Sequence, residues 1–155
     1  MNWRDITDLQ QLDILTAQRL GYTVRSFERD KGAVWELYAP NGFQVGDGSY
    51  ASERAAWRMG CPDYTSDLNA AAGLLPDNTD LDIRMVGDSV TVKRRILAPR
   101  FVDLPYVAVN DKAYAFMGDD YVERPSSPNW TPLQRLCIAL VISWHALMDE
   151  RERGK

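Results

Sequence analysis

The amino-acid sequence predicts an α+β fold, in which a mostly antiparallel sheet carries helices on both faces as an α-β-α sandwich. Turns of hairpin length join the expected strands, and no strand–helix–strand repeat recurs along the chain. The last helix is apolar nearly all round in its middle, which is typical of a helix buried on more than one side.

A helix is predicted over residues 5–20, because its apolar residues fall along one stripe at helical spacing. Asp5 is the expected N-cap, and Gly21, just past the end, is the expected C-cap. One face of this helix should therefore pack while the other meets water.

Three antiparallel strands and a short helix should follow. Residues 22–28 and 33–39 are rich in aromatic and β-branched side chains, and a short turn joins them. A second turn leads into a third strand over residues 43–45. Residues 52–59 predict a short helix.

In the middle of the chain, apolar residues first recur at helical spacing, and pairs of segments with strand-like patterns then follow. The expected elements are a helix over residues 67–75 with Ser66 as its N-cap, hairpins of residues 81–86 with 89–97 and of residues 106–109 with 113–117, and a loop over residues 118–129.

The closing helix should begin after Thr131 as its N-cap, with Pro132 at the first helical position, where the missing N–H costs nothing. It should end near Arg151, whose charge suits the negative end of the helix dipole. We expect it to be the central core helix. The side chains expected to be inaccessible are Leu136, Cys137, Leu140 and Val141.

Size, composition and charge limit the function classes. The chain has 155 residues, of which 45% are hydrophobic and 26% charged, as in globular proteins. We expect a single domain over residues 1–150 and a frayed tail over residues 151–155. The net charge of −4 repels long nucleic acid and anionic membranes, so any anion site must be local.

Apolar stretches are short, and the longest, residues 137–142, falls well below the roughly 20 residues that a membrane-spanning helix needs. The N-terminus also lacks the cationic and then apolar stretches of a signal peptide. We therefore expect no membrane association and a cytoplasmic location.

Two segments and the order of the elements resemble one family. The segments are Pro62-Asp63-Tyr64-Thr65-Ser66-Asp67-Leu68-Asn69-Ala70-Ala71 and Thr131-Pro132-Leu133-Gln134-Arg135-Leu136-Cys137-Ile138-Ala139-Leu140. Leu20-Gly21 and the hairpin residue Trp35 fit the same pattern. In these features the chain resembles small bacteriophage and prophage proteins that carry the phage ABA sandwich domain.

The resemblance implies a phage origin, action in a host bacterial cytoplasm and a helix–sheet–helix sandwich, and it carries over no catalytic residues. Residues 46–60 and 81–124 look longer than the family pattern, which makes them candidates for added function. The segment around Tyr64 also has a structural explanation, because Tyr64 can pack as a staple while Ser66 and Asp67 cap a helix.

The sequence offers no set of residues that predicts catalysis. His145 is the only histidine, and a general-base role would need a nucleophile or carboxylate brought to it by the fold, the alternative being a structural imidazole. Cys61 and Cys137 lack the spacing of zinc ligands. Aspartates at Asp47, Asp88, Asp119 and Asp120 could hold magnesium, but turns favour aspartate anyway. We expect no enzyme, no metal and no cofactor.

Basic residues cluster on a predicted strand at Lys93, Arg94 and Arg95, with Arg84 on the strand paired to it. Strand alternation places Lys93 and Arg95 on one face and Arg94 on the apolar face. On that face Arg94 either forms an ion pair or is solvated, or it binds an anionic ligand. The last alternative is open because guanidinium groups bind phosphate bidentately.

A second cluster, Arg54, Trp57 and Arg58, places a flat aromatic ring beside cations at helical spacing. This chemistry stacks a base and holds its phosphate, although Trp57 can instead pack its helix against the core. We predict that both clusters meet in one site. The candidate ligand-binding residues are Arg54, Trp57, Arg58, Arg84, Lys93, Arg94 and Arg95.

The sequence thus favours a non-enzymatic phage accessory protein that sequesters a small anionic, nucleotide-type host immune signal. The alternatives are a protein–protein inhibitor or structural accessory protein and, third, a nucleotide-cleaving enzyme. A homo-oligomer is expected, because aromatic residues exceed what a small core hides. These aromatic residues are Trp3, Trp57, Trp130, Trp144, Tyr50, Tyr114 and Tyr121.

Overall fold

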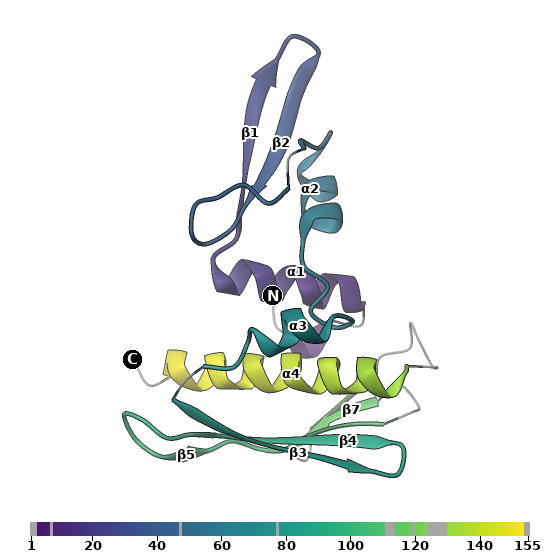
Figure 1. The fold of residues 1–155 in the computed structure, drawn as a ribbon, viewed down its shortest axis with the longest axis vertical. Coiled ribbons are helices and arrows are strands. Elements are labelled where there is room, and N and C mark those ends of the chain that lie inside the picture. The colour runs from purple at the N-terminus through teal and green to yellow at the C-terminus, as the bar shows by residue number, and fades with distance from the viewer. Residues whose placement is uncertain are drawn as a thin grey trace. The chain divides into compact units, whose positions relative to one another are not determined.

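The computed structural model describes residues 3–6, 8–46, 48–76, 78–110, 114–118, 120–123 and 130–153. In this part of the chain the fold is α+β, with antiparallel sheets and four α-helices, as predicted (Figure 1). The chain divides into two compact units, and the expected single domain over residues 1–150 stays a prediction. The smaller unit is Asp13–Pro62, and the larger joins Met1–Leu12 to Asp63–Lys155.

The first α-helix, α1 (Leu9–Leu20), starts later than predicted, because Asp5 belongs to a preceding 3-10 turn, Trp3–Asp5. The side chain of Asp8 accepts the N–H of Gln10 at 3.0 Å and so satisfies an N-terminal donor. The predicted C-cap is confirmed, since Gly21 adopts a φ of +104°, which L side chains rarely adopt.

In the smaller unit, β1 (Thr23–Arg29) and β2 (Gly32–Tyr38) form the predicted hairpin. The predicted short helix is α2 (Glu53–Gly60), which packs on this hairpin. The expected third strand over residues 43–45 is wrong, because only an isolated bridge joins Tyr38 to Gln44. Two backbone bonds flank this bridge, from the N–H of Ala39 to the carbonyl of Phe43 at 2.9 Å and from the N–H of Val45 to the carbonyl of Leu37 at 2.7 Å, so the pairing with β2 is limited to one bridge.

We expect Gly60→Ala to lower the free energy of unfolding by about 1–3 kcal/mol through overpacking. A Cβ at this position would lie 2.9 Å from Cδ2 of Leu37 and 3.1 Å from the hydroxyl of Tyr50, and the fully buried Leu37 would have to shift within the core. Urea unfolding would measure the change. The matched control is Gly48→Ala, where the new Cβ meets open space; equal stability losses in the two variants would contradict the expected clash.

The larger unit contains a six-stranded sheet in which all described pairings are antiparallel. Its path runs β3-β4-β6-β7-β8, and β5 pairs with β4. The bounds are β3 (Thr79–Val86), β4 (Ser89–Ile96), β5 (Val102–Asp103), β6 (Val107–Val109), β7 (Tyr114–Met117) and β8 (Asp120–Glu123). Both predicted hairpins of this region are confirmed.

The predicted loop over residues 118–129 is wrong at its start, because residues 120–123 form β8. Gly118 has a φ of +59° and turns the chain back so that Asp120 pairs with Met117. Residues 124–129 lie outside the described part of the chain.

The helix α3 (Leu68–Ala72) is shorter than predicted and begins one residue later. Its N-cap is Asp67 rather than Ser66, because the Asp67 carboxylate accepts the N–H of Asn69 at 2.9 Å. The helix ends at Gly73, whose N–H bonds back to the carbonyl of Asn69.

The closing helix α4 (Pro132–Arg153) has the predicted N-cap. The Thr131 hydroxyl accepts the N–H of Gln134, and the Gln134 side chain accepts the N–H of Thr131, each at 3.1 Å. These reciprocal bonds make a capping box. The helix continues to Arg153, past the expected end near Arg151.

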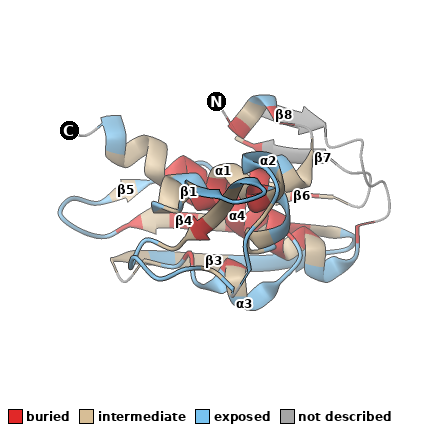
Figure 2. Ribbon diagram, turned by 90° about the horizontal axis from the view of Figure 1, so that it is seen from above, coloured by how far each residue is buried: buried red, intermediate tan, exposed pale blue. Residues whose placement is uncertain are grey.

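The core of the larger unit lies between α4 and the sheet, where α4 packs on β4 and β6. Figure 2 shows the middle of α4 in the colour of buried residues. Cys137, Leu140 and Val141 are inaccessible as predicted. The prediction for Leu136 is wrong, because it is only half-buried and follows the exposed Leu133 on the same side of the helix.

The four tryptophans expected at an interface are instead buried within the chain. Trp3, for example, stacks on His145 with 6.4 Å between ring centroids. Tyr50 is half-buried, and the side chains of Tyr114 and Tyr121 lie outside the described ones. Among the described side chains, the most exposed large apolar ones are those of Phe43, Met59, Met85, Val86 and Phe101.

Candidate anion-binding site

The predicted basic cluster of β4 divides between the two faces of the sheet. Burial alternates along this strand, so Lys93 and Arg95 are half-buried whereas Arg94 is fully buried on the side of α4. The predicted direction of Arg94 is therefore confirmed, and it follows from the two-residue period of a strand.

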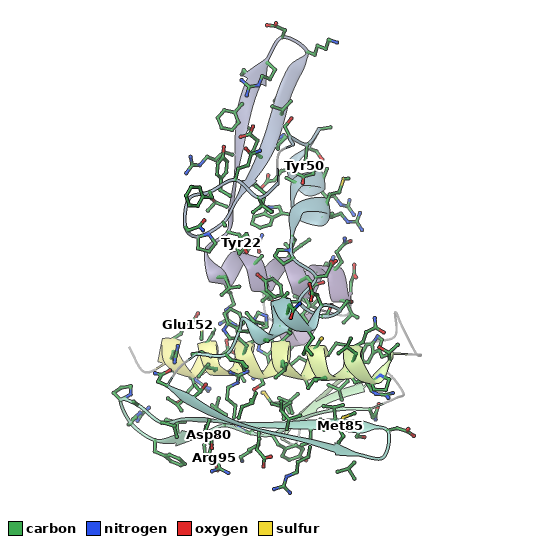
Figure 3. The ribbon with its side chains drawn as sticks, viewed as in Figure 1. Tyr22, Tyr50, Asp80, Met85, Arg95 and Glu152 are labelled. Atoms are coloured by element: carbon green, nitrogen blue, oxygen red, sulfur yellow. The ribbon has the colours of Figure 1, made fainter. Side chains whose placement is uncertain are left out.

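The outward-facing cations of this cluster have carboxylate partners. Nζ of Lys93 lies 3.3 Å from Asp103, and Nη2 of Arg84 lies 3.2 Å from Asp82. Arg95 lies 3.8 Å from Asp80, and Figure 3 shows these two side chains together on the outer side of the sheet. Exposed pairs of this kind add little stability, but they leave this face balanced in charge and unsuited to collecting an anion.

Arg94 has no carboxylate partner among the described residues. Its Nε donates to Oγ of Ser143 on α4 at 2.8 Å, and its Nη1 donates to the carbonyl of Leu74 at 3.4 Å. Its Nη2 is buried and has no hydrogen-bond partner in the described structure. A fully buried cation held only by neutral acceptors carries a desolvation cost that no counter-charge offsets.

A second arginine without a described carboxylate partner lies near Arg94. Nη2 of Arg151, in the last turn of α4, donates to Oδ1 of Asn78 at 2.6 Å, which is another neutral acceptor. Burial and then the charge of Arg151 lower the pKa of Arg94 to about 10, so Arg94 stays charged at neutral pH. We call these two residues the arginine pair.

A cavity of about 320 Å³ is lined by Arg151 of the arginine pair, whereas the fully buried Arg94 is not among its lining residues. Ile96, the next inward-facing residue of β4 after Arg94, also lines it, together with Pro99 and Val102. The wall is mostly apolar and also carries four polar side chains, those of Asn78, Arg100, Glu150 and Arg151.

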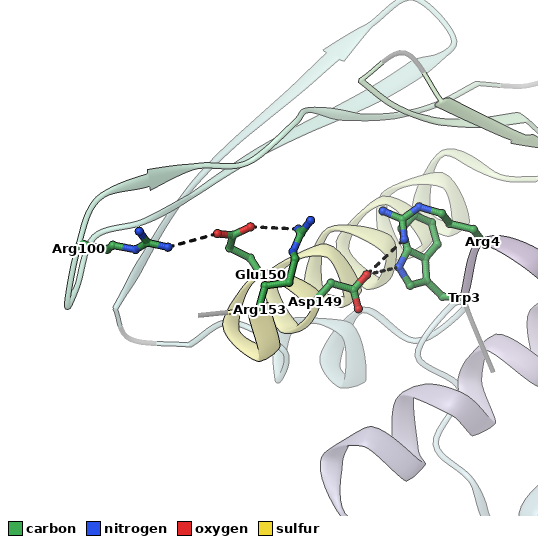
Figure 4. A network of polar contacts seen from close by, with 6 residues as sticks. All are labelled: Trp3, Arg4, Arg100, Asp149, Glu150 and Arg153. Carbon is green, nitrogen blue, oxygen red and sulfur yellow. Dashed lines mark hydrogen bonds and ion pairs between the residues drawn. The ribbon is translucent and has the colours of Figure 1, made fainter. Parts of the chain in front are cut away.

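Glu150 is the acidic residue that lines this cavity, and its carboxylate is already engaged. It lies 3.6 Å from Arg100 and 3.0 Å from Arg153 (Figure 4). These two exposed cations offset its charge, so Glu150 is not the counter-ion of the arginine pair.

A second cavity of the same unit, of about 490 Å³, has a more acidic wall that includes Asp103, Asp149 and Glu150. Asp149 accepts from the indole of Trp3 at 3.0 Å and from Arg4 at 3.3 Å (Figure 4). This wall suits an anion less well than the cavity lined by Arg151.

The second predicted cluster lies on α2, in the smaller unit. Trp57 is 9% exposed, so its ring packs within the protein as the structural alternative expects. Arg54 and Arg58 are exposed on this helix. Because the two clusters belong to different units, each described by itself, their meeting in one site stays a prediction.

The histidine and the cysteines differ in burial. His145 is fully buried, and its ring meets the edge of Trp144 with 5.0 Å between centroids. Cys61 and Cys137 are free thiols. In the described part of the chain, no three His, Cys, Asp or Glu side chains gather as a metal site requires. Of the predicted magnesium ligands, Asp47, Asp119 and the side chain of Asp120 lie outside the described residues.

Sequence reasoning missed the partners of Arg94, because they are distant in the chain. The sequence around Ser143 does not indicate a polar contact with β4. The position of Arg151 near the end of α4 is already explained by the helix dipole. Only the packing of α4 on the sheet brings these residues to Arg94.

No described helix combines the length and the apolar character that crossing a bilayer requires. Comparisons with protein-family models, curated proteins and solved structures give no match for this chain. The resemblance to phage ABA sandwich proteins therefore stays a prediction.

Proposed function

We propose that this protein is a non-enzymatic binding protein that sequesters a small anionic ligand of the nucleotide type. The observation that carries the proposal is the arginine pair, in which two guanidinium groups repel each other and reach only neutral acceptors among the described residues. A phosphate group would supply the missing negative charge and acceptors for Nη2 of Arg94.

The neighbouring cavity supports the choice of a small ligand with a flat apolar part. Its volume of about 320 Å³ lies at the lower end of the range for small-molecule sites, roughly 300–1,000 Å³. Ile96, Pro99 and Val102 offer an apolar wall. Arg151 and Arg100 both bring positive charge to the cavity, and Arg100 is paired with Glu150. Of the basic cluster predicted on β3 and β4, Arg94 belongs to the proposed site. The outward-facing Arg84, Lys93 and Arg95 form ion pairs instead.

The biological setting of the proposal rests on the family resemblance. It places the protein in a host bacterial cytoplasm, as a phage accessory protein that withholds a nucleotide immune signal. The same resemblance implies helices on both faces of the sheet. The packing of α4 on one face supports one of these two helical layers.

The test is to incubate the purified protein with a panel of cyclic nucleotides, remove the unbound fraction, heat the protein and analyse what is released. Intact release of one nucleotide supports sequestration. Release of an altered nucleotide would instead indicate a nucleotide-cleaving enzyme. Absence of uptake would contradict the proposal and leave a protein–protein inhibitor or a structural accessory protein as the alternative.

A further inference from the structure

The strand β3 forms one edge of the six-stranded sheet. Among the described strands it pairs only with β4, so its other side has no strand opposite. It is eight residues long and contains neither proline nor lysine, two residues that commonly block pairing at an exposed edge, and its charged residues Asp80, Asp82 and Arg84 lie on the outer face.

The backbone groups on the open side can be assigned from the hydrogen-bond alternation. The N–H of Leu97 donates to the carbonyl of Asn78 at 2.9 Å, and this pair continues the register of β3 with β4. Because bonded and non-bonded pairs alternate in antiparallel sheets, residues 80, 82 and 84 bond to β4. The residues whose N–H and C=O groups face the open side are Leu81, Ile83 and Met85.

The side chains of these three residues form an apolar strip on the face that carries α4. Leu81, Ile83 and Met85 lie opposite Arg94, Val92 and Val90 of β4, and cross-strand partners share a face. Ile83 is nevertheless 44% exposed and Met85 60% exposed, so this strip lies partly open to solvent.

We propose that the partner of this edge is β3 of a second copy of the chain, in an antiparallel pair with Ile83 opposite Ile83. Leu81 then lies opposite Met85, and each of these pairs exchanges two backbone bonds. On the outer face Asp82 lies opposite Arg84 at two symmetric positions. The pairing would give the expected homo-oligomer a defined interface, and it is independent of the arginine pair.

Charge selects this register. The register is the choice of which residue lies opposite Ile83. Shifting that residue by two positions keeps the apolar strip on the same face. One such shift in one direction places Asp82 opposite Asp82, although it also sets Asp80 opposite Arg84 at two positions. One such shift in the other direction places Arg84 opposite Arg84. Of the three registers, the proposed one alone has opposite-charge pairs and no like-charge pair. Within one chain Arg84 and Asp82 already lie 3.2 Å apart, so the proposed pairing groups four charges of alternating sign.

The test uses charge reversal at the edge and its restoration. Wild type should show the mass of two chains by light scattering at micromolar concentration. Arg84→Glu places a glutamate opposite Asp82 of the second copy and should raise the dimer Kd about tenfold or more. The double variant Asp82→Arg/Arg84→Asp is self-complementary again and should recover the dimer. Arg95→Glu, one strand inward on the outer face, is the control and should stay dimeric.

Amide hydrogen exchange gives an independent reading of the geometry. The N–H groups of Leu81, Ile83 and Met85 should become protected as protein concentration rises, whereas those of Asp82 and Arg84 should be protected at all concentrations. A wild-type mass of one chain would overturn the proposal and leave this edge to another protein. A dimer that Arg84→Glu leaves intact would overturn it as well, because the contact would then lie on another face.

Discussion

Arg94→Met is expected to abolish nucleotide retention while leaving the folded state intact. Loss of a charged phosphate contact should remove roughly 1.5–3 kcal/mol of binding free energy, or about one to two decades of affinity. The unfolding free energy of the ligand-free variant should stay within about 1 kcal/mol of wild type or exceed it, because methionine replaces a buried cation that lacks a counter-charge. Equilibrium dialysis and urea unfolding would measure the two effects.

The control for this prediction is Arg95→Met, the neighbouring residue of β4 that faces outward and pairs with Asp80. It should retain the nucleotide. If Arg94→Met binds the nucleotide as tightly as wild type, the site lies elsewhere. If it instead unfolds the ligand-free protein, Arg94 serves the core through Ser143 and Leu74 and the functional assignment fails.

Leu140→Ala should lower the free energy of unfolding by about 2–5 kcal/mol, because it leaves a cavity in a core that cannot fully collapse. Leu140 is 2% exposed and lies in the continuous buried stretch of α4. Urea unfolding followed by circular dichroism would measure the loss.

The matched control for this truncation is Leu133→Ala on the same helix, where the side chain is 48% exposed. It should change stability by no more than about 0.5 kcal/mol. A loss below about 1 kcal/mol for Leu140→Ala would contradict the central position of α4 in the core.

Local patterns predicted the parts of this fold that depend on short-range geometry. The period of a strand placed Arg94 inward, and the Thr131-Pro132 pair marked the start of α4, because both signals act within a few residues. The hairpin of β3 and β4 was predicted for the same reason, since a turn of two residues joins strands of matching length.

The remaining features depend on packing between distant segments. The tryptophans were expected at an interface because a sequence does not show how much aromatic area the packing of distant segments buries. The start of α1 was missed because Asp5 and Asp8 both suit an N-cap, and the sequence does not show that Asp5 belongs to a separate 3-10 turn. The arginine pair joins positions 94 and 151, which have no common local pattern.

The most direct measurement of the proposed anion site is the side-chain Nε–H resonance of Arg94 in ¹⁵N-labelled protein, assigned by its loss in Arg94→Met. Titration with the nucleotide that the uptake assay identifies should shift this resonance and leave that of Arg95 unchanged, because Arg94 alone of the two lies on the side of α4. Shifts confined to residues other than Arg94 and Arg151 would contradict the assignment of the arginine pair as the anion site.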